Sequence, residues 1–74
     1  STEEGIKQIK NNYDKIKEWK NINELIPKFY FNKEMKKTGL AGIFSASLEL
    51  TKEGSTKLLQ EKIFEKVMIK KVKI

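Results

Sequence analysis

The chain contains no cysteine, no histidine and no arginine among its 74 residues. Without cysteine, a disulfide scaffold, a thiolate zinc site and a cysteine nucleophile are excluded together. Without histidine, the chain lacks the usual general base at neutral pH and the commonest nitrogen ligand for metals. We therefore expect a protein that is not an enzyme and that needs no cofactor and no metal ion.

Long apolar runs are also missing. No run approaches the roughly 20 apolar residues of a membrane span, and residues 1–4 lack the basic and then apolar build of a signal peptide. These observations predict a cytoplasmic protein without a membrane partner. A chain this short buries only about 60% of the surface that it exposes when unfolded, so we expect a single domain over residues 1–74 with a small core.

Positive charge is what the chain has in excess. All 16 basic residues are lysines, and they outweigh the 10 acidic residues to give a net charge of +6. Such a balance is typical of nucleic-acid-binding domains. Arginine is the residue best suited to bidentate contacts with phosphate and guanine, so its absence makes the net charge weak evidence for that class.

Two helices are expected in the first third of the chain. Apolar residues recur at spacings of three and four between Glu3 and Ile16, which predicts an amphipathic helix over Glu3–Ile16. Asn21 and Glu24 then have the spacing of a capping box, which predicts a second helix. Pro27 cannot continue a helix, so the second helix must be short.

The third and longest helix is predicted to run from about Lys33 to Glu53. Asn32 is a suitable N-cap, and Gly54 can end the helix in the left-handed conformation. Apolar side chains cover so much of its circumference that we expect it to lie at the centre of the domain. The predicted core comprises Ile6, Ile9, Tyr13, Trp19, Leu25, Ile43, Phe44 and Leu48.

After Gly54 the period of the apolar residues changes to two, as in strands. Two antiparallel strands are predicted, joined by the six residues Glu61–Lys66. The alternation sends Leu59 and Met68 to the face opposite Leu58 and Val67. Three helices followed by a two-stranded ribbon is the element order of a winged helix, so the predicted fold is α+β of that kind.

Two segments resemble a known family. Residues 38–54 read TGLAGIFSASLELTKEG, and residues 19–27 read WKNINELIP. Together with four residues further along the chain, these segments resemble the C-terminal domain of the segregation and condensation protein A family, the kleisin subunits of bacterial condensin. The four further residues are Leu58, Gln60, Phe64 and Ile69.

The resemblance implies a binding module with a role in chromosome condensation and segregation. In that family the C-terminal domain docks on the ATPase head of an SMC subunit. Other condensin subunits would be reached through a part of the kleisin that this chain does not contain, and DNA would be contacted only indirectly or non-specifically, at the nucleoid. Two positions depart from the family pattern: Ile63 stands where a proline is usual, and Thr56 stands where an apolar residue is usual.

The predicted ribbon carries the candidate partner-binding residues. Leu59 and Met68 are apolar yet point away from the helices, and Lys57 and Lys70 lie on the same outer face. Such a face is suited to strand addition or hydrophobic docking. Scattered surface apolar residues are the other interpretation, since these are common. The resemblance favours docking.

Aromatic residues have two interpretations each. Phe64, also a candidate partner-binding residue, either covers the end of the domain's own core or inserts into a partner, and the small core favours the first. Phe29–Phe31 either pack in the core or stack on nucleic-acid bases, and the lack of arginine favours packing. The alternative function is a basic winged-helix nucleic-acid-binding domain, for which Lys33, Lys36 and Lys37 form the candidate cluster.

Overall fold

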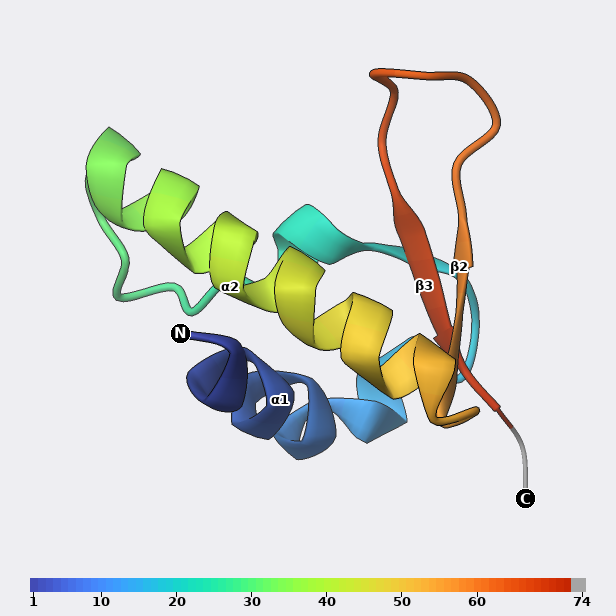
Figure 1. Ribbon diagram of the computed structural model, residues 1–74. Helices are drawn as coiled ribbons and strands as arrows, with labels where there is room; N and C mark the ends of the chain where they lie inside the picture. The colour runs from blue at the N-terminus through green and yellow to red at the C-terminus, as the bar shows by residue number, and fades with distance from the viewer. Residues whose placement is uncertain (73–74) are drawn as a thin grey trace.

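A computed structural model describes residues 1–72 of the chain (Figure 1). Two α-helices lie side by side, and a three-stranded antiparallel sheet in the order β1-β3-β2 packs beside them. The β2–β3 hairpin extends beyond the helices (Figure 1). The elements in chain order are α1 (Thr2–Asn11), a 3₁₀ helix η1 (Tyr13–Ile16), β1 (Lys20–Asn21), a 3₁₀ helix η2 (Ile22–Leu25), α2 (Lys33–Lys52), β2 (Thr56–Leu59) and β3 (Met68–Lys71).

The predicted winged helix, with three helices and a two-stranded ribbon, is wrong. Only two α-helices are present in residues 1–72, and the sheet has a third strand, β1, in which Lys20 lies opposite Ile69 of β3. The expected second helix is a single 3₁₀ turn. The Asn21 side chain accepts from the backbone N–H of Asn23 at 2.9 Å rather than from that of Glu24, and Ile26 is already extended, as expected of the residue before a proline. The fold is a mixed α+β domain.

The boundaries of α2 follow the sequence closely. The predicted N-cap is confirmed, because the Asn32 side chain accepts from the backbone N–H of Met35 at 2.8 Å. Gly54 has a φ of 84°, the left-handed conformation expected after the helix end. The first helix is shorter than predicted: α1 ends at Asn11, and a 3₁₀ helix continues from Tyr13 to Ile16.

A close approach of the two α-helices organises the core. Gly5 of α1 is buried directly against Gly42 and Ala46 of α2, so that a Cβ atom at position 5 would overlap the Gly42 carbonyl group and lie 2.9 Å from the Ala46 Cβ. Because glycine has no side chain there, the helix backbones can pack at this short separation. The contact fixes α2 against α1 and leaves the opposite flank of α2 uncovered.

The core is formed by eight apolar residues from both helices, the 3₁₀ turns and β3. Three residues predicted to belong to it do not: Trp19 is exposed, Phe44 is 40% exposed and Leu48 is 49% exposed. Phe44 and Leu48 lie on the uncovered flank of α2. The buried apolar residues are Ile9, Ile16, Ile22, Leu25, Ile43, Ala46, Leu50 and Ile69.

Thr56 shows how a polar residue is accommodated in the interior at the start of β2. Its side chain is buried, and its hydroxyl shares a hydrogen bond of 2.8 Å with the hydroxyl of Thr51 on α2. A buried hydroxyl with a partner costs far less than an unpaired one. This bond ties the start of β2 to the last turn of α2.

Candidate docking surface

The outer face of the sheet brings four of the five sequence-predicted partner-binding residues together. Lys57 lies opposite Lys70, and Leu59 lies opposite Met68, in the register of β2 and β3. Directly opposite residues in an antiparallel pair point to the same side, so all four side chains share one face. The inner face carries Leu58 and Ile69, which pack on the helices. The predicted inward and outward alternation is confirmed.

Trp19, which the sequence places in the predicted core, belongs to the same outer face. It precedes β1, whose Lys20 pairs with Ile69, so Trp19 lies across from Lys70. The Lys70 ammonium is 5.9 Å from the centroid of the Trp19 ring, within the range of a cation–π contact. We call the surface formed by Trp19, Lys57, Leu59, Met68 and Lys70 the docking face.

Lys70 is held in place on the docking face by two neighbours. Besides the Trp19 ring, its ammonium lies 3.9 Å from a carboxylate oxygen of Glu18. An exposed ion pair of this length contributes little to stability. The Glu18 carboxylate and the Trp19 ring both lie beside the Lys70 ammonium. Lys57 on the neighbouring strand has no ion pair within residues 1–72.

The fifth predicted residue, Phe64, lies at the tip of the hairpin loop. Its side chain is 100% exposed, so the favoured interpretation that it covers the domain's own core is wrong. Its φ of 69° is in the left-handed region, which is unfavourable for an aromatic residue. Two hydrogen bonds hold the loop: Gln60 donates to the Glu65 carbonyl at 2.7 Å, and the Glu65 N–H donates to the Lys62 carbonyl at 3.1 Å.

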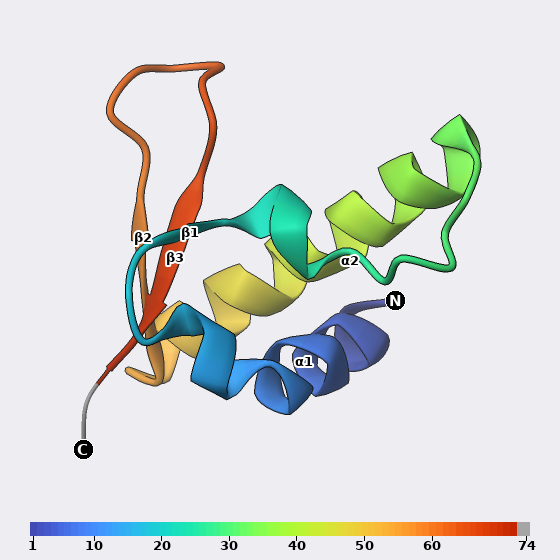
Figure 2. The same ribbon diagram turned by 180° about the vertical axis from the view of Figure 1, so that it is seen from behind.

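The aromatic triplet Phe29–Phe31 is also more exposed than predicted. Core packing is wrong for two of its members, because Phe29 is 73% exposed and Phe31 is 78% exposed. Tyr30 between them is partly buried, and its ring covers Gly39 of α2. The triplet belongs to the connection that passes alongside the N-terminal half of α2, at the end of the molecule away from the hairpin loop (Figure 2).

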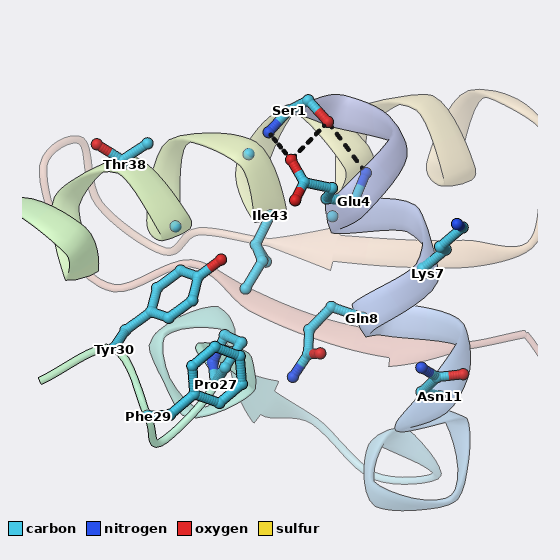
Figure 3. Close-up of a pocket in the computed structure, with 13 residues that line it drawn as sticks. Ser1, Glu4, Lys7, Gln8, Asn11, Pro27, Phe29, Tyr30, Thr38 and Ile43 are labelled. Carbon is cyan, nitrogen blue, oxygen red and sulfur yellow. Dashed lines mark hydrogen bonds and ion pairs between the residues drawn. The ribbon is translucent and has the colours of Figure 1, made fainter.

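A cavity of about 390 Å³ lies between α1, α2 and this connection (Figure 3). Two of its polar side chains have partners within the chain: Gln8 donates to the Leu25 carbonyl at 2.9 Å, and the Glu4 carboxylate accepts from the ammonium and the hydroxyl of Ser1. The hydrogen bonds from the ammonium and then from the hydroxyl lower the pKa of Glu4. No buried side-chain polar atom among residues 1–72 lacks a partner. The cavity therefore shows no demand for a ligand.

The described part of the chain holds no group of three or more histidine, cysteine, aspartate or glutamate residues placed to bind a metal ion. None of the helices in residues 1–72 is both long enough and apolar enough to cross a lipid bilayer. That the protein is not an enzyme and needs no cofactor stays a prediction from its composition. The surface features that remain as candidates for function are its exposed apolar side chains and its lysines.

Four lysines, Lys17, Lys57, Lys70 and Lys71, line a hollow beside the sheet, and four others line a groove of about 820 Å³ between η2, the connection and α2. Apolar residues from these elements, among them Tyr30 and Leu40, line its floor. Its exposed charged residues are Lys28, Lys33, Lys36, Lys37 and one carboxylate, Glu24. We call this region the lysine groove.

Three lysines of the groove oppose the stability of α2. Lys33 is three and four residues from Lys36 and Lys37, and all three stand at the positive end of the helix dipole. A Lys33→Glu variant is expected to raise the free energy of unfolding by about 0.5–1 kcal/mol, measured by urea denaturation at low salt. The matched change at the other end of the helix, Lys52→Glu, should lower it. Equal effects of both variants would contradict the dipole argument.

Comparison with known proteins leaves the chain without an assigned family. Neither a scan against protein families nor searches of curated proteins and of solved structures finds a match.

Proposed function

We propose that this chain is a non-catalytic docking module of a bacterial SMC–kleisin complex, and that the docking face binds the ATPase head of an SMC subunit. The observation that carries the proposal is the docking face itself. It gathers Trp19, Leu59 and Met68 on one side of a sheet, with Lys57 and Lys70 beside them. The resemblance to the kleisin family supplies the identity of the partner.

The composition of the docking face supports protein binding. Stable interfaces are dominated by a few apolar anchors, with tryptophan enriched among them, inside a rim of polar or charged residues. A standard interface takes about 800 Å² from each partner. The chain exposes 5727 Å² in all, so such an interface would occupy about one seventh of its surface. We expect the docking face and the hairpin tip to supply a surface of this scale.

The edge of β2 gives the partner a second means of attachment. In the order β1-β3-β2, no other strand in residues 1–72 pairs with the outer edge of β2. Alternate backbone N–H and C=O groups of such an edge are free to bind a strand of another chain. A partner strand added there would extend the docking face and would fix the register of the complex.

The test is to mix the 74-residue chain with an SMC head fragment and to measure binding by size exclusion and titration calorimetry. We expect a one-to-one complex with a negative heat-capacity change, because apolar surface is buried. Affinity should fall only modestly with salt, since apolar anchors are insensitive to screening. Absence of a complex at low salt and at micromolar concentration would contradict the proposed partner.

A parallel titration with duplex DNA distinguishes the alternative function, nucleic-acid binding, from docking on an SMC head. Sequence-specific reading of a duplex by α2 is disfavoured, because the exposed residues at its centre are Phe44, Ser45, Leu48 and Glu49 rather than arginine, asparagine or glutamine. Duplex DNA held by phosphate contacts alone would give a steep loss of affinity with salt. Tight duplex binding together with no head binding would favour the alternative.

A further inference from the structure

We propose that the lysine groove and the two exposed phenylalanines of the connection, Phe29 and Phe31, bind a single-stranded nucleic acid. The Phe29 ring contacts the ring of Tyr30, which lines the groove. The lysines would contact the phosphates, and the rings of Phe29 and Phe31 would stack on bases. This site does not rest on the proposed docking function. It lies on the connection and the N-terminal half of α2, whereas the docking face lies on the outer side of the sheet (Figure 2).

Charge is the first observation that supports this site. Lys28, Lys33, Lys36 and Lys37 line one groove with a single carboxylate, Glu24. None of the four lysines forms an ion pair with a residue in the described part of the chain. The groove therefore presents positive charge that the protein does not neutralise, as expected of a surface that tracks a phosphate backbone.

Exposed aromatic rings are the second, independent observation. Phe29 and Phe31 are 73% and 78% exposed, so they contribute little to the core. The Phe29 ring meets the Tyr30 ring edge to face, with centroids 5.1 Å apart and an interplanar angle of 81°. This contact orients Phe29 without burying it. Large apolar rings kept at the surface next to lysines are typical of platforms on which unpaired bases stack.

The rings and the lysines are adjacent along the chain. Lys28 immediately precedes Phe29, and Lys33 follows Phe31 after one intervening residue. Residues one or two apart have Cα atoms about 4–7 Å apart. A single strand that follows the connection would therefore meet rings and lysines in turn.

Other anionic ligands fit these observations less well. In a duplex the base faces are stacked on one another, so exposed phenylalanines gain nothing from it. An acidic peptide would use the lysines but would leave the two rings without a role. A single strand uses both kinds of side chain, and its phosphates and base faces are common to DNA and RNA.

The test measures fluorescence anisotropy of a labelled mixed-sequence oligonucleotide titrated with the whole chain at several salt concentrations. Deoxy- and ribo-oligonucleotides of the same sequence show whether the site binds DNA, RNA or both. If all four lysines contact phosphates, the plot of log affinity against log salt should have a slope of about −3. Polyglutamate, which carries the charge without the bases, should compete only weakly, and duplex DNA should bind less tightly than the single strand.

Variants separate the contributions of rings and charges. Phe31→Ala should weaken binding about tenfold and leave the salt slope unchanged, because stacking involves no released counterions. Lys36→Gln combined with Lys37→Gln should reduce the slope by about 1.4. The matched controls are Phe64→Ala, which removes an exposed ring elsewhere, and Lys15→Gln combined with Lys17→Gln. Both controls should bind the oligonucleotide as the parent chain does.

Any of three results would overturn the proposal. The first is no binding of either oligonucleotide at low salt. The second is equal losses in the groove variants and their controls, which would indicate non-specific attraction to a basic protein. The third is polyglutamate or duplex DNA binding as tightly as the single strand with no effect of Phe31→Ala, which would assign the groove to an acidic protein segment or to duplex backbone. None of these results bears on binding to the SMC head, which involves a different surface. Failure of the nucleic-acid proposal would therefore leave the docking proposal intact.

Discussion

A Gly5→Ala variant is expected to lose about 2–4 kcal/mol of stability, although alanine is ordinarily the better helix former by about 1 kcal/mol. The added Cβ would overlap the Gly42 carbonyl group and would stand 2.9 Å from the Ala46 Cβ. Backbone atoms cannot move aside as a flexible side chain can, so α1 and α2 must separate along their whole contact. The unfolding free energy from urea or thermal denaturation measures the loss.

Gly39→Ala is the matched control for that prediction. It is the same substitution in a helix of the same domain, but the atom nearest to the new Cβ is in the Tyr30 ring, at 2.6 Å. Tyr30 belongs to a connection between elements and can rotate or shift, so the cost should be smaller and the gain in helix propensity should offset part of it. If Gly5→Ala were as stable as Gly39→Ala, the close approach of the helices would not be essential.

Replacing Leu59 and Met68 together by lysine is expected to abolish docking on the SMC head, with a loss of at least about 100-fold in affinity. Both side chains lie on the docking face and opposite each other in β2 and β3. The substitutions would place two further charges beside Lys57 and Lys70 and would require their desolvation in the complex. The circular dichroism spectrum should stay the same, and thermal stability should fall only slightly through repulsion across the strand pair.

Two further variants make that prediction specific. Leu59→Gln combined with Met68→Gln removes the apolar anchors without adding charge, so it should also lose most of the affinity. Phe31→Lys changes a more exposed apolar residue away from the docking face and should leave head binding unchanged. Normal binding by the double lysine variant would show that the docking face is not the contact. Unfolding of that variant would show instead that the two residues belong to the core.

Local sequence patterns predicted α2 and the hairpin, because their signals are long and unambiguous. The N-cap at Asn32, the turn at Gly54 and the alternation of Leu58 with Leu59 are all set within a few residues of the chain. The assignment of Leu59, Met68, Lys57 and Lys70 to one face followed from the same alternation.

Features that depend on contacts distant in sequence were not predictable in this way. β1 has only two residues, too few to show a period, and it exists because of its pairing with β3. Trp19 was therefore placed in the core instead of on the docking face. Phe44 and Leu48 were misplaced for a related reason: a wide apolar arc on α2 does not reveal which flank α1 covers, and the packing of Gly5 decides it. Loop positions such as Phe64 carry no periodic signal at all.

The order of the strands has a consequence for how the protein folds during synthesis. β3, the third of the described strands in chain order, is the central one, and both β1 and β2 pair only with it among the described strands. Until β3 has been made and has left the ribosome, neither of its two neighbours has a partner strand. The sheet must therefore close in one late step that joins Lys20 to Ile69. Until then two unpaired strands are exposed to chaperones and to aggregation, and this late closure rather than helix formation should limit the folding rate.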